Sequence, residues 1–241
     1  MALELTLDYR MRLMDFDRYG HVQPWALLDL FQDVATEHAN MLHIGRDDML
    51  PQGVFWAVIR TKYEVVRFPG YHQPVKVHTW PHSLSRFSFI RDFSLLDEAD
   101  DLLVKASSEW VLMDIETRKF VSARDYYAGP EDFLEDRSFP KKPRKVPAFD
   151  EGNRRVLTVA PSFCDIDVNG HVNNAMYAKY VVNAFEPDGA SAIKSFQIDY
   201  RQEAKLGEPL AVHSLVEDGR VLAKGLREDG EISFASAIEL A

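Results

Sequence analysis

The densest group of polar side chains lies between Asp165 and Asn174, where the sequence reads DIDVNGHVNN. Asp167, Asn169 and His171 alternate along this stretch. Because alternate residues of an extended segment point to one side, we expect these three side chains to converge. A carboxylate, an amide and an imidazole together can bind a carbonyl group, orient water and move a proton. The pattern therefore predicts a site suited to hydrolysis.

Polar residues just before an apolar helix also have an ordinary explanation, as turn and capping residues. For Asn173 and Asn174 we favour helix capping, and both are also candidates for substrate binding. An Asx turn requires one such side chain, whereas this stretch has three in alternation. We therefore interpret Asp167, Asn169 and His171 as a functional set. The free amides of the following helix could receive an oxyanion beside it.

A second copy of this stretch lies 150 residues earlier, where Asp15 to Pro24 reads DFDRYGHVQP and five of the ten positions are identical. Both copies follow a strand-like segment, which favours an internal duplication. The earlier copy has Tyr19 where the later copy has its asparagine, and tyrosine lacks the paired donor and acceptor of an amide. We therefore predict that Asp17 and His21 are structural and that the chain has one site.

The elements around both copies follow one order. Residues 1–10 and the segment before the second copy are strand-like, and an amphipathic helix follows each copy, with Pro24 in the first turn of the earlier helix. We expect antiparallel strands after each helix, at 55–68, 75–80, 87–95, 102–112 and 118–122, and then at 193–202, 209–217, 220–228 and 232–240.

A single helix cannot cover both faces of such a sheet, so the simplest solution is a sheet that wraps around its helix. We predict an α+β fold of the tandem (double) hotdog type, with an antiparallel sheet around a central helix in each half. Residues 129–153 are rich in proline and charge and are interpreted as a linker between domains at 1–128 and 154–241. Its basic run, 141–145, is interpreted as solvated.

Composition excludes several classes of function. The apolar fraction of 46% is enough for a sizeable core, and a net charge of −10 argues against broad nucleic-acid binding. The chain has no apolar run near the length of a membrane span and no signal-peptide pattern at its start. Its one cysteine excludes an internal disulfide and a thiolate-rich metal site. We expect a cytoplasmic protein without a metal or cofactor.

Hydrolysis also requires a base, and Glu203 is the candidate. It lies in the segment YRQEA, residues 200–204, at the end of the first long strand after the second helix. A carboxylate near the other polar residues could activate water. A solvent-facing strand residue is an equally good explanation from sequence alone.

These residues resemble the signature of the acyl-ACP thioesterase family. The resemblance includes Asp165 to Asn174, with Tyr177 behind it, and the segment DYRQE that ends at Glu203. In the first half, the segments at 56–60, 91–92, 108–114 and 117–119 also resemble this family. The pieces occur in the family's order and spacing over nearly the whole chain.

The resemblance implies a double hotdog that hydrolyses the thioester between a fatty acyl chain and acyl carrier protein. It assigns the catalytic set to Asp167, Asn169, His171 and Glu203. Many plant members have a cysteine directly after the glutamate, once proposed as a nucleophile, but here this position is Ala204. A carboxylate must then be the base. Asp167 either orients the reacting groups or attacks the thioester to form an anhydride.

The acyl chain is expected in an apolar groove built largely by the first half. Candidates for lining it are Trp25, Phe31, Phe55 and Trp56, although core packing is the stronger interpretation of each. Cys164 is expected to be a small core residue. An acidic carrier protein would dock on basic residues, for which the candidates are Arg60, Lys62, Arg67, Arg86, Arg91 and the run at 141–145.

Two other functions fit the same residues. One is an acyl-CoA thioesterase with the same fold, and the other is a non-catalytic acyl-binding or regulatory module. A hotdog dehydratase is a weaker third candidate, because that chemistry places its acid and base differently. A homodimer is compatible with the sequence, which leaves the preferred acyl chain undefined.

Overall fold

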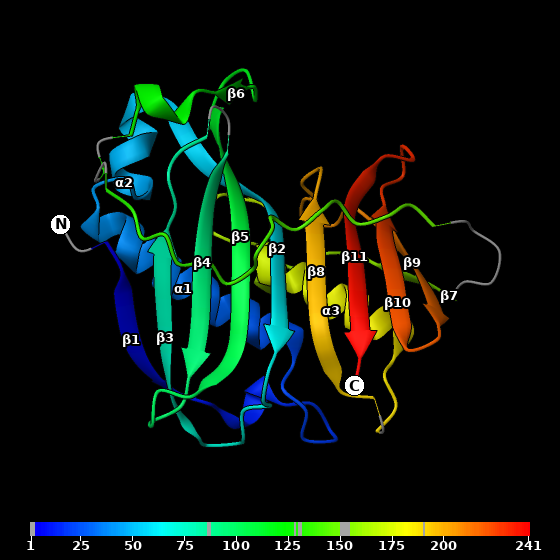
Figure 1. The fold of residues 1–241 in the computed structure, drawn as a ribbon. Helices are drawn as coiled ribbons and strands as arrows, with labels where there is room; N and C mark the ends of the chain where they lie inside the picture. The colour runs from blue at the N-terminus through cyan, green and yellow to red at the C-terminus, as the bar shows by residue number, and fades with distance from the viewer. Residues whose placement is uncertain (1–2, 86–87, 128, 130–131, 150–154, 190) are drawn as a thin grey trace. The chain divides into compact units, whose positions relative to one another are not determined.

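The computed structural model describes residues 3–85, 88–127, 129, 132–149, 155–189 and 191–241 (Figure 1). The chain packs as two compact units. Unit 1 comprises Met1–Arg12 and Asp29–Pro143, and unit 2 comprises Leu13–Leu28 and Arg144–Ala241. These units cross the predicted boundaries (1–128, 129–153 and 154–241), because the first copy of the turn packs with the second half of the chain.

The elements follow the predicted order. The helices are α1 (Pro24–Met41), α2 (Arg46–Met49) and α3 (Asn174–Phe185), with 3-10 turns η1 (Leu13–Asp15), η2 (Leu50–Gln52), η3 (Ala123–Asp125) and η4 (Phe163–Asp165). The strands are β1 (Leu5–Arg10), β2 (Val54–Val65), β3 (Pro74–Pro81), β4 (Phe89–Leu96), β5 (Leu102–Asp114), β6 (Phe120–Val121), β7 (Arg155–Val159), β8 (Ile193–Tyr200), β9 (Leu210–Glu217), β10 (Arg220–Leu226) and β11 (Ile232–Leu240).

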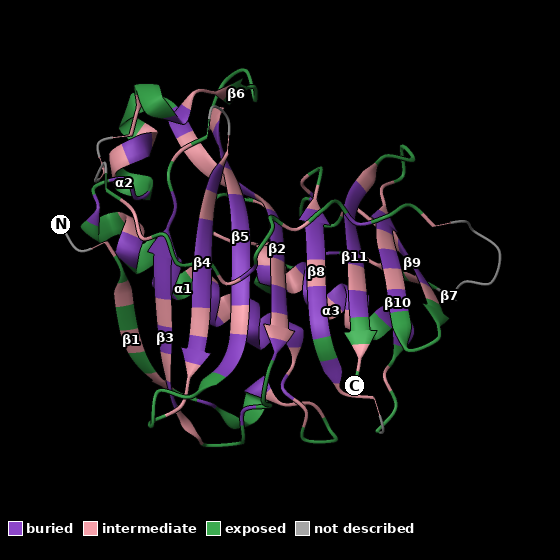
Figure 2. Cartoon of the chain, viewed as in Figure 1, coloured by how far each residue is buried: buried purple, intermediate pink, exposed green. Residues whose placement is uncertain are grey.

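Unit 1 is an antiparallel sheet in the order β1-β3-β4-β5-β2, with β6 paired to β5. The part of α1 that belongs to this unit covers one face of the sheet (Figure 1). Phe31 of α1 packs on Phe93 of β4 with ring centroids 5.0 Å apart. Buried residues concentrate on the central strands, whereas β1 alternates exposed and half-buried residues (Figure 2). The predicted helix-on-sheet packing is therefore present in this unit.

Unit 2 repeats the arrangement with the order β8-β11-β10-β9-β7, again antiparallel. Helix α3 lies against β7, β9 and β10. Tight turns join β9 to β10 and β10 to β11, where Gly219 and Gly230 have φ of 73° and 83°. These positive values explain the glycines, since other residues are strained there. Both predicted hairpins are confirmed.

The first long strand of each unit ends earlier than predicted, at Val65 in β2 and at Tyr200 in β8. Beyond each end, two consecutive amides donate to one carbonyl. The amides of residues 66 and 67 share Leu103 O, and those of residues 201 and 202 share Ser233 O. This irregularity breaks the ladder, so the following residues leave the sheet.

The predicted linker has no helix or strand over residues 132–149, yet it is anchored by hydrogen bonds. In unit 1, Ser138 N donates to Asp92 Oδ2 at 2.8 Å. In unit 2, Val146 N donates to Asp199 Oδ2 at 2.8 Å. The basic run within it is not fully solvated, because Lys142 pairs with Glu109, a buried residue. Buried carboxylates thus take the place of regular structure in holding this segment.

No helix in the part of the chain that the structure describes is long and apolar enough to cross a membrane.

Candidate functional site

The stretch from Asp165 to Asn174 forms a tight turn in unit 2, between η4 and α3. Ile166 and Val172 form an isolated antiparallel bridge, and the amide of residue 167 donates to the carbonyl of residue 171 at 2.9 Å. Gly170, inside the turn, has a φ of 78°, a conformation that favours glycine. The polar side chains therefore converge through a turn, and not through the extended segment expected from their alternation.

The carboxylate of Asp167 organises this turn. Its Oδ1 accepts from the amides of Asn169 at 2.8 Å and His171 at 3.5 Å. Its Oδ2 accepts from Asn169 Nδ2 at 3.2 Å. Both carboxylate oxygens are thus engaged by the turn, and the Asn169 side chain is held against Asp167.

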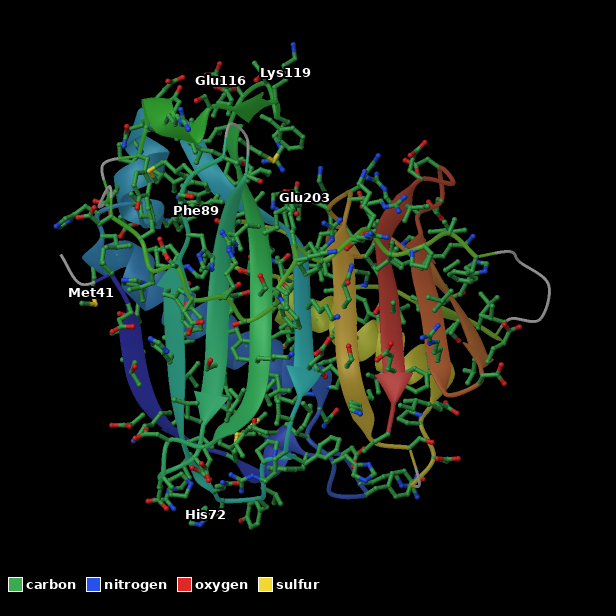
Figure 3. The ribbon with its side chains drawn as sticks, viewed as in Figure 1. Met41, His72, Phe89, Glu116, Lys119 and Glu203 are labelled. Carbon is green, nitrogen blue, oxygen red and sulfur yellow. The ribbon has the colours of Figure 1, made fainter. Side chains whose placement is uncertain are left out.

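The imidazole of His171 points to Glu203. His171 Nε2 and Glu203 Oε2 lie 3.1 Å apart, a hydrogen-bond distance. The two side chains are 24% and 40% exposed, so a substrate can reach both. Glu203 lies beyond the end of β8, as Figure 3 shows, and not within the strand. The structure therefore brings all four predicted catalytic residues to one place.

Helix α3 begins at this turn. Asn173 is its N-cap residue, and Asn173 Oδ1 accepts from Ala175 N at 2.9 Å. Asn174 is the first helical residue, and its carbonyl accepts from Tyr200 Oη at 3.1 Å. The capping interpretation of Asn173 agrees with this geometry. The positive end of the helix dipole lies next to His171 and favours negative charge there.

Two residues at the site were not identified from the sequence as functional. Tyr177 accepts a hydrogen bond from Ala204 N at 2.9 Å, and Ser233 Oγ donates to Gln202 O at 2.7 Å. Burial raises the pKa of Tyr177, so its hydroxyl is neutral near pH 7. The resemblance includes Tyr177 but gives it no role, and no sequence pattern marks Ser233, because its partner is a backbone group.

The four candidates for the acyl groove already have packing partners. Trp25, in unit 2, lies under the ammonium group of Lys179, 4.3 Å from the ring centroid. In unit 1, Phe31 packs on Phe93, and Phe55 lies under the Arg118 guanidinium at 4.8 Å. Trp56 stacks on Phe89 at 5.6 Å and donates its indole N–H to Ile44 O. These residues belong to separate clusters, and their contact with an acyl chain stays a prediction.

The prediction that Arg60 and Arg91 dock the carrier protein is wrong, because both residues are buried. Arg60 pairs with Glu109 at 3.1 Å inside unit 1. Arg91 donates to His38 Nδ1 at 2.9 Å and to Thr79 Oγ1 at 3.2 Å, and burial lowers the pKa of Arg91 to about 10. Neither guanidinium can reach a partner protein.

The other described docking candidates divide by whether an acidic partner is present. Those with acidic partners are Lys62 with Glu64, Arg67 with Asp97, and Lys142 with Glu109. Lys141, Arg144 and Lys145 are exposed. Arg86 lies outside the described residues. Lys141, Arg144 and Lys145 are therefore the docking candidates that the structure leaves open.

Cys164 is exposed in η4, so the prediction of a core cysteine is wrong. The 3-10 turn before the motif directs this side chain outward. Over the described residues, no group of three or more His, Cys, Asp or Glu side chains could hold a metal ion.

Comparison with known proteins gives consistent matches over both halves. Residues 3–129 match the acyl-ACP thioesterase N-terminal domain, and residues 150–236 match the acyl-ACP thioesterase C-terminal domain. A chloroplastic acyl-[acyl-carrier-protein] hydrolase, FATB2 of Cuphea viscosissima, is 27% identical over 208 residues, which are 78% of this chain and 48% of that protein. The chloroplastic oleoyl-acyl carrier protein thioesterase 2 of Arabidopsis thaliana is 26% identical over 200 residues, 74% of this chain and 54% of that protein.

The chain thus spans about half the length of the curated relatives it matches. Solved structures agree over the whole chain. An acyl-ACP thioesterase of Bacteroides thetaiotaomicron is 21% identical with a TM-score of 0.88, covering 99% of this chain and 98% of that chain. The 12:0-ACP thioesterase of Umbellularia californica is 22% identical with a TM-score of 0.89, covering 100% and 98%. The predicted α+β tandem hotdog fold is confirmed.

Proposed function

Because the chain belongs to the acyl-ACP thioesterase family, we propose that it hydrolyses the thioester that links a fatty acyl group to acyl carrier protein. The observation that carries the proposal is the 3.1 Å contact between His171 Nε2 and Glu203 Oε2. A carboxylate beside an imidazole, both open to solvent, can bind and deprotonate a water molecule. This pair lies next to the N-terminus of α3, where developing negative charge is stabilised.

In this mechanism, Glu203 accepts a proton from a water molecule that His171 helps to orient. The water oxygen forms a bond to the thioester carbonyl carbon, and the carbonyl oxygen becomes an oxyanion. We assign the stabilisation of that charge to the first-turn amides of α3 and the Asn169 side chain, because N–H donors at a helix N-terminus favour an anion. The carbon–sulfur bond then breaks, and the thiolate takes the proton from Glu203. The products are a free fatty acid and the carrier thiol.

For Asp167 we propose an orienting role. Its two oxygens accept hydrogen bonds from Asn169 and from the His171 amide within the turn. A nucleophile would have to give up some of these bonds to attack. Because both Asp167 oxygens accept hydrogen bonds, attack by water is favoured over attack by the Asp167 carboxylate, which would form an anhydride.

The partner implied by this function is acyl carrier protein with its fatty acyl chain. Exposed cations of the basic run, Lys141, Arg144 and Lys145, are available for an acidic carrier. If they dock it, turnover on carrier-bound substrate falls as salt rises, because screening weakens exposed ion pairs. A salt-independent rate would exclude electrostatic docking there.

The test is release of fatty acid from a panel of acyl carrier substrates of different chain length, with the same chains on coenzyme A in parallel. We expect faster turnover on the carrier substrates and a loss of about 100-fold or more in Glu203→Gln. Glu208→Gln is the matched control, since Glu208 lies in the same loop and accepts from Lys205 N at 3.2 Å.

The alternatives make distinct predictions in this assay. An acyl-CoA thioesterase turns over the coenzyme A substrates as fast or faster. A non-catalytic module retains the acyl ligand and releases no fatty acid, and Glu203→Gln then changes nothing. Either result would replace the proposed function.

A further inference from the structure

Glu203 lies on a segment without regular structure, which follows β8 from residue 201 to residue 205. The sheet ladder therefore does not fix its backbone. A base must nevertheless be held within roughly 0.5 Å of its productive position. The hydrogen bonds of the two peptide groups that flank Glu203 must supply this precision.

Each flanking peptide group is hydrogen-bonded to one buried side chain, one to Tyr177 and the other to Ser233. On the following side, Ala204 N donates to Tyr177 Oη at 2.9 Å. On the preceding side, Gln202 O accepts from Ser233 Oγ at 2.7 Å.

The directions of these bonds follow from the protons available. Ser233 has one hydroxyl proton, and it is given to Gln202 O. On the other side of Glu203, Tyr177 Oη accepts from Ala204 N. Glu203 thus lies between one peptide group that is bound by Tyr177 and one that is bound by Ser233. We call these two side chains, with their hydrogen bonds to the flanking peptide groups, the Tyr177–Ser233 clamp.

We propose that Tyr177 and Ser233 are positioning residues that hold Glu203 against His171. The inference rests on the proposed function, since it concerns the base of that reaction. Tyr177 and Ser233 are both buried, so neither is expected to touch substrate. Their effect must pass through Glu203.

The clamp is joined to the rest of the site by two further links. Tyr177 comes from the first turn of α3, the helix that starts directly after the motif. Ala204 O accepts from Val172 N at 3.1 Å, next to His171 in the chain. Helix α3, the turn and the Glu203 loop are therefore connected through one residue, Ala204.

The clamp is also anchored in the sheet. Ser233 lies on β11, and its backbone carbonyl accepts from the amides of Arg201 at 2.8 Å and Gln202 at 3.1 Å. Packing holds the tyrosine, with the Tyr177 ring centroid 5.3 Å from that of Phe234. A side chain fixed in this way can transmit position, because it has little freedom to follow a displaced loop.

The first test measures kcat and KM for Tyr177→Phe and Ser233→Ala on an acyl carrier substrate. We expect kcat to fall by about 10-fold to 100-fold, because a displacement near 1 Å at a catalytic group costs this much. KM should change little, since the variants leave substrate contacts intact. Thermal unfolding of each variant shows whether the fold is retained.

Ser236→Ala is the matched control. Ser236 lies on the same strand, is buried like Ser233, and donates to Gln197 O at 2.8 Å. Ser236→Ala also loses one hydrogen bond from a serine hydroxyl to a backbone carbonyl, but the carbonyl belongs to Gln197 of β8, which is not next to Glu203. We expect similar losses of stability in Ser233→Ala and Ser236→Ala, with a loss of kcat only in Ser233→Ala.

A second readout does not depend on turnover. The ring-nitrogen chemical shifts of His171, measured by NMR, report its contact with Glu203. Glu203→Gln defines the shifts without the carboxylate, and the clamp variants should move toward them. Ser236→Ala should keep the shifts of the unaltered protein.

The proposal is overturned if folded Ser233→Ala retains kcat and the His171 shifts, or if Ser236→Ala loses as much kcat. Should Tyr177→Phe fail to fold, Ser233→Ala decides alone. A different result marks failure of the proposed function, namely no release of fatty acid by the unaltered protein. In that case the NMR comparison still decides whether the clamp positions Glu203.

Discussion

The turn from Asp15 to Pro24 and the turn from Asp165 to Asn174 have the same internal frame. In each, the aspartate at the third position accepts from the amides at the fifth and seventh positions. In each, the glycine at the sixth position has a positive φ, 86° and 78°. The second and eighth residues form an isolated bridge in both copies. The identical residues of the duplication therefore belong largely to the scaffold.

The two turns differ in what surrounds the imidazole. His171 meets Glu203 at 3.1 Å, whereas His21 Nδ1 lies 3.6 Å from Asp17 Oδ2. Within the described residues this buried nitrogen of His21 has no hydrogen-bond partner. Tyr19 packs on the chain after α3, where a Cβ added to Gly189 would lie 2.9 Å from its ring. The first turn thus uses its differing residue for packing, and the second uses its asparagine at the site.

The largest difference is expected from removing each histidine. His171→Ala should lower kcat/KM on an acyl carrier substrate by about 100-fold or more, because the proposed mechanism uses this imidazole to orient the attacking water. His21→Ala should keep most of the activity, since no carboxylate outside its own turn faces that ring in the described contacts. Comparable losses in the two variants would mean that both turns take part in the reaction.

Exchanging the residues at the fifth position of the two turns, Tyr19 and Asn169, tests the role of each. Asn169→Tyr removes the amide that donates to Asp167 Oδ2, so kcat should fall by roughly 10-fold to 100-fold. Tyr19→Asn should retain kcat and lose about 1 kcal/mol of unfolding free energy, because the ring contact near Gly189 is lost. Kinetics and denaturant unfolding measure these effects. A kinetic defect in Tyr19→Asn would contradict the packing role.

Replacing the glycine of each turn with alanine separates an effect on stability from an effect on catalysis. Gly20→Ala and Gly170→Ala should each cost about 1 to 2 kcal/mol, the strain of a left-handed backbone at a residue with a Cβ. No atom lies within 4 Å of the added Cβ at either position, so a clash does not contribute. The unfolding temperature should fall similarly in both variants. Only Gly170→Ala should also lower kcat, and equal activity in the two would count against a strained site.

The smallest effect concerns the tyrosines behind the complete turn. Burial raises the pKa of Tyr177 and of Tyr200. In the unfolded chain both hydroxyls ionise near pH 10. Stability is therefore fully present below about pH 10 and falls as pH rises further, because the folded state keeps these protons longer.

Tyr200→Phe tests this sign. Its unfolding free energy should fall less between pH 8 and pH 10.5 than that of the unaltered protein, when both are measured by denaturant titration. The variant also loses the bond to Asn174 O, which lowers stability at both pH values alike. An identical pH dependence in both proteins would exclude Tyr200 as a source of alkaline sensitivity.

Much of the site could be predicted because its signals are local. Three polar residues in alternation before an apolar helix are visible in ten positions, and so is the substitution of tyrosine in the first copy. Strand and helix order followed from periodicity for the same reason. Exact strand ends could not be predicted, since they depend on which carbonyl two neighbouring amides share.

The sequence predictions are wrong at residues whose role depends on their exposure to solvent. Charge alone predicts a docking surface that includes Arg60 and Arg91, whereas both are buried with partners inside unit 1. Residue type predicts a core position for Cys164, but its 3-10 turn leaves it exposed. Residue type gives only an average burial, and the fold sets the individual value.

By itself, the sequence determined the duplicated helix-and-sheet units, the turn at Asp165 to Asn174, and the one copy with a complete polar set. These properties depend on residue types at short spacing. Only the tertiary structure decided that Glu203 reaches His171, since 32 positions of chain separate them. It also decided how Glu203 is held, through the Tyr177–Ser233 clamp. Contacts between distant segments form only when the sheet and helix bring them together, so no local pattern records them.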